Sequence, residues 1–366
     1  MKKYTTMITK DYLSHWDVVN GVREYLTNAL DGSAPFEYEI GEDFVIFTSV
    51  GITLPATIFA MGYSKNRDDS SAVGQFGEGS LVGMIPLLRE GKGICFINGG
   101  VTWRPSFEYN EALGIETLTI NEEENNCNDE NYSVVIDNLT PSEIKQIRES
   151  CTYFRTDLGE TLEGTRGQVF KGISGKLFVG GIFVKDLQSH EFSYNFKPEY
   201  LQLNRDRKSV DSWDLADNTS KLLEEVFPVK ELVTLVKKNS MDTGSFYAKL
   251  QSEEVAEAAY EDFKEKYGET AIVARGSDER DELQKIGYTN VQVVHNEQYR
   301  DLIKRSDSYN TFVEAIEETL EEVEVDNRTP VEMLEDFIEK HDLFGAESDL
   351  NDLIDLFKEK GVEWSQ

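Results

Sequence analysis

The stretch EYLTNALD, residues 24–31, decides how the N-terminal part of this sequence is interpreted. Wound as a helix at about 100° per residue, it separates its side chains into two faces. The apolar face collects Val19, Val22, Leu26, Ala29 and Leu30. The opposite face carries Glu24, Asn28 and Asp31, at spacings of four and three residues. This polar column is either a solvated stripe or the lining of a site that uses a base and a metal ligand.

A glycine-rich segment follows at residues 62–83, GYSKNRDDSSAVGQFGEGSLVG. Gly74, Gly77 and Gly79 precede an apolar helix predicted over 80–90, which Pro86 should kink or end early. Glycines let the backbone approach a ligand closely, and a helix N-terminus presents free N–H groups that bind phosphate. A structural loop or a simple helix entry uses the same residues, so this segment alone does not decide the matter.

Taken together, the two stretches supply the parts that nucleoside triphosphate hydrolysis requires. Glu24 could polarise a water molecule as general base. Asn28, one turn later, offers an amide oxygen to Mg²⁺, a hard cation that keeps several of its waters. Asp31 could order that hydration shell.

The motifs E-x-x-x-N-A-x-D at 24–31, G-Y-S-K at 62–65 and G-Q-F-G-E-G at 74–79 resemble the GHKL ATPase superfamily. This superfamily contains DNA gyrase B, the ninety-kilodalton heat-shock chaperone, histidine kinases and MutL. The glycine motif follows the acid by about fifty residues, as it does in that group. With the later runs LLREGK, GKLFVGGIFVK and LNRDR, the pattern also resembles uncharacterised GHKL-like ATP-binding proteins of bacteriophages.

The resemblance implies an α+β protein with a Bergerat ATP-binding domain over residues 1–138, a mixed sheet with helices on one face. ATP and Mg²⁺ are the implied cofactors, with Glu24 as general base and Asn28 as the metal ligand. The implied nucleotide-binding residues are Asn28, Asp31, Gly62, Lys65, Gly74, Gln75, Phe76, Gly77, Glu78 and Gly79.

Two further catalytic candidates follow by weaker similarity. The loop LQLNRDRKS at 201–209 resembles the heat-shock chaperone's middle-domain loop, where an arginine reaches the γ-phosphate. Arg207 stands at the matching position, with Arg205 as the alternative, and a permanently charged guanidinium suits that role. Lys185, which ends GIFVK, could act as the lysine of other family members. Ordinary surface charges would explain all three residues equally well.

The sequence departs from the family at the adenine-reading motif D-x-G-x-G. Residues 47–52 read FTSVGI, so only Gly51 survives and Phe47 occupies the acid's place in the simplest alignment. Thr48 or Ser49 could instead accept the hydrogen bond from the adenine amino group. Otherwise nucleotide selectivity is relaxed, because a lost hydrogen-bond partner costs discrimination, or nucleotide binding has been lost.

The remaining chain alternates strands and helices. Strands are expected at 36–40 and 44–48, and four more between 93 and 137 with an exposed loop at 122–131. Thr140 opens a helix at the start of a second, transducer-like α/β domain over 139–235. Residues 236–366 form an acidic α/β and helical region, with strands at 271–275 and 291–295.

Composition limits the classes of partner. The 69 acidic and 37 basic residues give a net charge of −32, which repels nucleic acids and anionic membranes. Such a surface either serves solubility or imitates nucleic acid to capture a DNA-binding protein. The three cysteines support neither a disulfide framework nor a zinc site. Without a signal peptide or an apolar membrane segment, the protein is expected in the cytoplasm, that of the host if it is phage-encoded.

Two functions follow from this sequence. The first is a Mg²⁺-dependent, slow ATPase in which nucleotide closes a lid and acts on a protein partner or a homodimer. The second is an acidic module that binds a host factor or a defence protein, with nucleotide as a conformational ligand or absent. A histidine kinase is disfavoured, because no dimerisation helix precedes the domain. The 271–295 unit lacks the paired acids of a metal-dependent nuclease.

Overall fold

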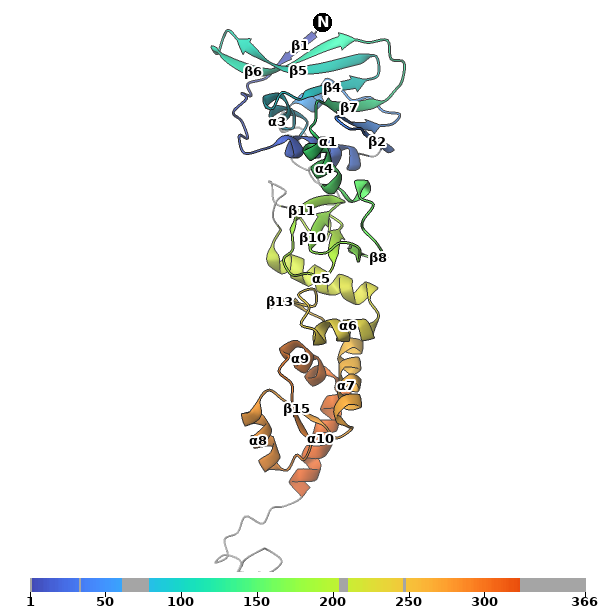
Figure 1. The fold of residues 1–366 in the computed structure, drawn as a ribbon, viewed down its shortest axis with the longest axis vertical. Helices are drawn as coiled ribbons and strands as arrows, with labels where there is room; N and C mark the ends of the chain where they lie inside the picture. Colours follow the sequence, from blue (N-terminus) through green and yellow to red (C-terminus); the bar gives the residue numbers. More distant parts are fainter. Residues whose placement is uncertain (1, 33, 61–78, 204–209, 246–247, 323–366) are drawn as a thin grey trace, which may run out of the picture.

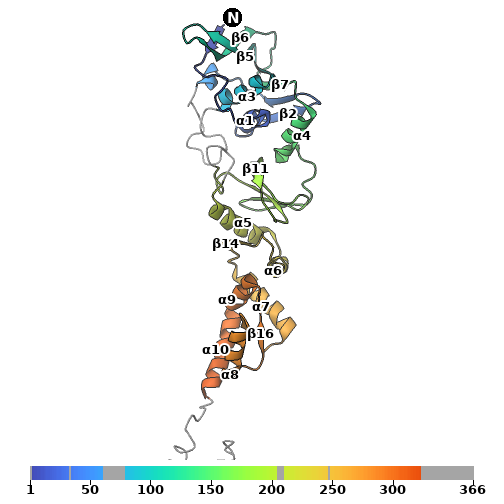
Figure 2. The same ribbon diagram turned by 60° about the vertical axis from the view of Figure 1, so that its left-hand side comes forward.

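The computed structural model describes residues 2–32, 34–60, 79–203, 210–245 and 248–322. The chain is elongated, with a large sheet at the N-terminal end, a smaller sheet in the middle and a helical α/β unit at the other end (Figures 1 and 2). The molecule is therefore an α+β protein, as the sequence predicts.

The N-terminal sheet has seven strands in the order β1-β6-β5-β4-β7-β3-β2. They are β1 (Lys2–Thr5), β2 (Phe36–Ile40), β3 (Val45–Ser49), β4 (Gly93–Asn98), β5 (Val101–Asn110), β6 (Ile115–Glu124) and β7 (Tyr132–Asp137). Every neighbouring pair is antiparallel, so the expected mixed sheet is wrong. The hairpins β2–β3, β4–β5 and β5–β6 explain this, because a tight turn reverses the chain whereas parallel strands need a long crossover. The loop expected at 122–131 is also shorter, since β6 runs to Glu124.

Three helices cover one face of this sheet: α1 (Val18–Leu30), α2 (Gly79–Val82) and α3 (Met84–Arg89). The prediction for the first helix is confirmed, and the Asp17 side chain caps it by accepting from the backbone N–H of Asn20 at 2.8 Å. In β3, Val45, Phe47 and Ser49 are buried towards these helices, whereas Ile46 and Thr48 are half-buried on the other face. Among the described residues, this alternation is typical of a sheet that helices cover on one side.

The predicted helix at 80–90 forms as two pieces that meet at Gly83. Pro86 is the cause, because its nitrogen has no hydrogen to donate to the carbonyl four residues earlier. Gly83 also lets α1 approach closely. A Cβ at Gly21 would lie only 2.7 Å from the Gly83 carbonyl oxygen, so these two glycines set the contact between the helices. The short helix η1 (Ala56–Phe59) lies between β3 and this pair.

The helix expected after Thr140 is confirmed as α4 (Pro141–Glu149). It begins with a reciprocal capping box between Thr140 and Glu143. Lys92 donates to the same glutamate at 2.8 Å, which ties the start of α4 to the N-terminal sheet. A 3-10 turn, η2 (Thr152–Phe154), leads into the middle sheet.

The middle sheet has five strands in the order β11-β10-β12-β9-β8. They are β8 (Thr161–Glu163), β9 (Gly167–Phe170), β10 (Lys176–Val179), β11 (Ile182–Asp186) and β12 (Ser193–Phe196). Only β10 and β12 run parallel. Helices α5 (Ser212–Val226) and α6 (Val229–Lys237) follow.

The last part of the described chain is an α/β unit. It comprises β13 (Gly244–Ser245), β14 (Ala248–Lys249), α7 (Glu253–Tyr267), β15 (Ile272–Ala274), α8 (Ser277–Ile286), β16 (Val291–Val293), α9 (Glu297–Arg305) and α10 (Asp307–Glu322). The predicted strand–helix–strand order is confirmed, with β15 and β16 parallel. The helices predicted beyond residue 322 lie outside the described residues.

Two hydrophobic cores hold these parts together. One lies under the N-terminal sheet; the other runs from the middle sheet through α5, α6 and α7 to α9. Ile182, at the start of β11, is 1% exposed and belongs to the N-terminal core. The backbone N–H of Phe183 donates to the Ser150 carbonyl at 2.8 Å, so the β10–β11 hairpin is anchored to the end of α4. The predicted boundary at 138/139 falls between β7 and α4, and the one at 235/236 falls within α6.

Among the described residues, no helix combines the length and the apolar character that crossing a bilayer would demand.

The pairing of the N-terminal strand β1 with β6 should weaken at low pH. Glu122 of β6 accepts from the indole of Trp103 at 3.0 Å, from Tyr4 at 2.7 Å and from Lys2 at 2.9 Å. These bonds, that of Trp103 first, lower the pKa of Glu122 from 4.5 to about 2. A lowered folded pKa gives stability that is present above pH 4.5 and is lost as pH falls towards 2. We expect Glu122→Gln to cost about 1 to 3 kcal/mol in urea unfolding at pH 6 and far less at pH 2.

The matched control is Glu111→Gln, which changes an exposed glutamate at the tip of the β5–β6 hairpin. It should leave the free energy of unfolding unchanged at both pH values. An equal cost of Glu122→Gln at pH 6 and pH 2 would contradict the assignment.

Candidate functional site

Glu24 is buried, whereas a residue on a solvent-facing helix stripe would be exposed. It lies in the middle of α1 and is 3% exposed. A Cβ at Gly79, the first residue of α2, would lie only 2.6 Å from Glu24 Oε2. The carboxylate therefore packs directly against the start of α2, and only glycine fits there without moving it. Burying a carboxylate costs free energy, and buried ionisable side chains occur often at functional sites.

Asn28 lies one turn further along α1, exposed, beside the same helix start. Its amide nitrogen would be 3.5 Å from a Cβ at Gly79 and is 3.4 Å from the Ser80 hydroxyl oxygen. Tyr25 holds this helix start from the other side, since its hydroxyl donates to the Ser80 carbonyl at 3.0 Å. Burial raises the pKa of Tyr25 well above its usual value, with smaller contributions from Tyr132 and Glu24. The hydroxyl thus stays protonated as a donor.

Asp31 is the C-cap of α1 and is half-buried. The last turn of this helix contains no basic residue. A carboxylate at the negative end of a helix dipole is unfavourable by roughly 0.3–1 kcal/mol. A cation bound near this end would offset that cost.

The donor set suits Mg²⁺ and a triphosphate. Glu24, Asn28 and Asp31 offer oxygen atoms, the ligands that this ion prefers. Among the described residues, no group of three or more His, Cys, Asp or Glu side chains forms a closed metal site. Mg²⁺ does not require such a cage, because it is usually held by one or two protein oxygens together with waters and substrate phosphates.

Three residues of the altered adenine-reading motif, Phe47, Thr48 and Ser49, lie on β3. Phe47 is 1% exposed and lies in the core, where its ring stacks on Phe154 with centroids 6.2 Å apart. The hydroxyl of Thr48 is 2.9 Å from that of Ser133 on the opposite face of the sheet. Ser49 shares the helix-covered face and precedes Gly51 by two residues, as the acid does in D-x-G. Ser49 thus fits the acid's position better than Phe47, and Thr48 faces away from it.

A cavity of about 290 Å³ lies between α1, α4 and the β10–β11 hairpin. Its lining includes Asn20 and Arg23 of α1 and Lys176 of β10. The Arg23 guanidinium donates to the Phe183 carbonyl at 3.2 Å, so α1 is bonded directly to β11 next to Glu24. Lys185 is half-buried on β11, opposite Leu177, and is not among the residues that line this cavity. Its catalytic role stays a prediction.

Four further residues neighbour this region and were not predicted from the sequence: Tyr25, Ser80, Arg23 and Lys176. Arg23 and Tyr25 flank Glu24 in the chain, which was a usable signal, but nothing in the sequence places Lys176 near α1. The other predicted site residues lie outside the described residues: Arg207, Gly62, Lys65, Gly74, Gln75, Phe76, Gly77 and Glu78.

No protein-family model matches this sequence. The chain is similar to an uncharacterized protein of Mycoplasma pneumoniae (strain ATCC 29342 / M129), with 22% identity over 239 residues. The similarity covers 61% of this chain and 97% of the Mycoplasma protein.

Among solved structures, the chain is similar to the ATPase region of Saccharomyces cerevisiae topoisomerase II bound to ICRF-187 (dexrazoxane). The TM-score is 0.33 and the sequence identity is 12%. The match covers 46% of this chain and 62% of the topoisomerase chain, so it spans less than two thirds of that structure. A likeness at this level does not establish a shared fold.

Proposed function

We propose that this protein binds ATP with Mg²⁺ on the polar face of α1 and hydrolyses it slowly as a GHKL-type ATPase. The observation that carries the proposal is the buried Glu24 carboxylate held against the start of α2, with Asn28 one turn away on the same side. A merely solvated stripe would leave Glu24 exposed and would not require glycine at position 79.

In this proposal each residue has one task. Glu24 accepts a proton from the attacking water, and its burial excludes other water from that position. Asn28 would hold Mg²⁺ through its amide oxygen, and Asp31 would orient the ion's waters. When bound, the ion would neutralise charge on the phosphates. The helix start at Gly79 and Ser80 would supply backbone N–H groups to those phosphates.

Lid closure over the nucleotide, action on a protein partner or homodimer, a cytoplasmic location and a phage origin belong to the same proposal. The hydrogen bond from Arg23 to the Phe183 carbonyl supports coupling, because it links α1 to the middle sheet beside Glu24. Lys185 and Arg207 are the proposed cationic residues from beyond the N-terminal sheet.

The direct experiment is phosphate release from ATP by the purified chain, with Mg²⁺ and with excess EDTA. We expect slow turnover, at or below about 1 s⁻¹, the lower end of typical enzyme rates, that disappears with EDTA. Turnover at the same rate in EDTA, or none at millimolar Mg·ATP, would reject the ATPase.

The same site makes a prediction about nucleotide choice. If the Ser49 hydroxyl accepts a hydrogen bond from the adenine amino group, Ser49→Ala should reduce the preference for ATP over GTP by about three- to tenfold. This is the change in affinity expected from the loss of one hydrogen bond between neutral groups. Competition binding measures this ratio. Thr48→Val is the matched control, since Thr48 faces Ser133 on the other side of the sheet. If Ser49→Ala left the ratio of ATP to GTP affinity unchanged, Ser49 would not be the residue that contacts the adenine base.

A further inference from the structure

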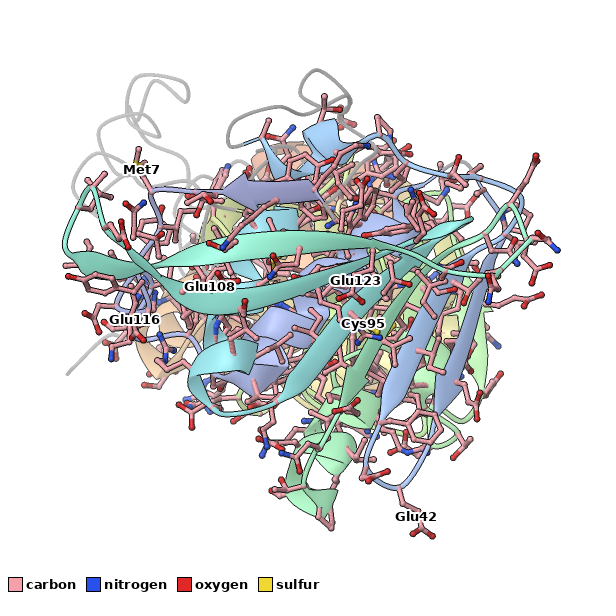
Figure 3. All side chains as sticks on the ribbon, turned by 90° about the horizontal axis from the view of Figure 1, so that it is seen from above. Met7, Glu42, Cys95, Glu108, Glu116 and Glu123 are labelled. Atoms are coloured by element: carbon pink, nitrogen blue, oxygen red, sulfur yellow. The ribbon has the colours of Figure 1, made fainter. Side chains whose placement is uncertain are left out.

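The face of the N-terminal sheet that points away from α1, α2 and α3 carries a row of apolar side chains. Ile46 of β3 is paired with Val135 of β7, which is paired with Cys95 of β4. All three are half-buried, whereas their neighbours along each strand are buried on the helix side. Figure 3 looks down on this end of the molecule, with Cys95, Glu108 and Glu123 labelled. Within the described part of the chain, no helix packs over this row.

Acidic side chains border the row. Glu39 of β2 is paired with Ile46, Glu37 lies two residues earlier on the same edge strand, and Asp137 follows Val135 by two residues on β7. All three carboxylates are exposed. We call Ile46, Val135 and Cys95, with Glu37, Glu39 and Asp137, the outer patch.

Two basic residues on this face are already matched by acids. Arg104 of β5 lies 3.5 Å from Glu123, and Lys3 of β1 bonds to Glu108. The Arg104 side chain also interacts with the Cys95 thiol, at the end of the row opposite to Glu39. The outer patch therefore has a net negative charge that is concentrated towards β2.

The charge decides which occupant fits. A second copy of this chain would bring a net charge of −32 against another acidic surface, and nucleic acid or an anionic membrane would also be repelled. An aliphatic row with carboxylates at one end matches a segment that combines aliphatic and basic side chains. Such a segment belongs to a basic partner protein.

The spacing favours a helix. Neighbouring strands lie about 4.8 Å apart, so Ile46, Val135 and Cys95 span about 10 Å across three strands. Residues i and i+7 of a helix are about 10.5 Å apart along its axis, with i+3 or i+4 between them. A helix that crosses β3, β7 and β4 would place one apolar residue over each member of the row.

We propose that the outer patch binds an amphipathic helix of a partner protein, with the helix's Lys and Arg residues over Glu37 and Glu39. This surface lies on the opposite side of the sheet from Glu24, so the helix binds without nucleotide and does not depend on the ATPase proposal.

The test uses a 14-residue helical peptide of Leu and Lys, with Leu at i, i+3, i+7 and i+10 and Lys elsewhere, and a Leu/Glu peptide of the same pattern. Fluorescence anisotropy with the full chain should show binding of the Leu/Lys peptide that weakens at least tenfold between 50 and 500 mM salt. Val135→Lys should weaken binding at least tenfold. Leu113→Lys, the same kind of change at an exposed position on the β5–β6 hairpin, should not.

Because Val135→Lys could misfold, a second measurement uses the unaltered protein and follows the alkylation of its cysteines. The peptide should slow alkylation of Cys95 at least fivefold while leaving the half-buried Cys127 unaffected. Buried Cys151, whose pKa burial raises to about 12, should stay unreactive and report that the fold is intact. Equal binding of the Leu/Glu peptide, no binding of the Leu/Lys peptide, or binding without protection of Cys95 would each overturn the proposal.

Discussion

Glu24→Gln should reduce ATP turnover at least about 100-fold while leaving ATP affinity within about threefold of the unaltered protein. Glutamine keeps the shape of the buried side chain but cannot accept the proton of the attacking water, and positioned acid–base groups contribute about 10²–10⁴-fold. The pocket against Gly79 stays filled, so phosphate binding should survive. Single-turnover hydrolysis and equilibrium binding of labelled ATP measure the two quantities separately.

The control for this substitution is Glu111→Gln, the same chemical change at an exposed hairpin position. It should leave both turnover and affinity unchanged. If Glu24→Gln retained full turnover, Glu24 would not be the base; if it lost affinity and turnover together, the carboxylate would serve binding instead of proton transfer.

Gly79→Ala should abolish most nucleotide binding without unfolding the N-terminal part. The added Cβ would lie 2.6 Å from Glu24 Oε2, so the Glu24 carboxylate must move away from the helix start and from its place beside Asn28. Alanine is otherwise the better helix residue, by about 0.5–1 kcal/mol, so α2 itself should not be lost. We expect at least tenfold weaker ATP binding at a nearly unchanged melting temperature.

Gly276→Ala is the matched control, because a Cβ at Gly276 would meet no atom within 4 Å. It should change neither property. A Gly79→Ala protein that bound ATP normally would show that the close approach of Glu24 to α2 has no role in binding.

Local rules in the sequence predicted the elements around the site well. The 3.6-residue period located α1, Pro86 explained the break between α2 and α3, and Thr140 located the start of α4. These features depend on residues within one or two turns of one another, so a single sequence contains them.

Contacts between distant parts of the chain were harder to predict from the sequence. The edge strand β1 pairs with β6 more than a hundred residues away, and no local pattern reports that contact. The burial of Glu24 likewise depends on α2, which meets α1 only after the chain has crossed the hairpin and the glycine segment. The sequence could show a polar column but not that its first member is enclosed.

The alternation along β3 could have been used at the sequence level. Val45, Phe47 and Ser49 alternate along β3, so all three share the helix-covered face, and a large aromatic at the middle position belongs to the core. Counting back two residues from Gly51 reaches Ser49 and leaves Phe47 as packing. Ser49 is therefore the candidate for the acid's position, and its contact with the base stays a prediction.

The central claim is tested most directly by calorimetric titration of the full chain with a non-hydrolysable ATP analogue, with and without Mg²⁺, beside the same titration of Asn28→Ala. The account predicts one binding site per chain that tightens at least tenfold with Mg²⁺, and an Asn28→Ala protein in which Mg²⁺ has little effect. No detectable binding at millimolar analogue, or an undiminished Mg²⁺ effect in Asn28→Ala, would contradict it.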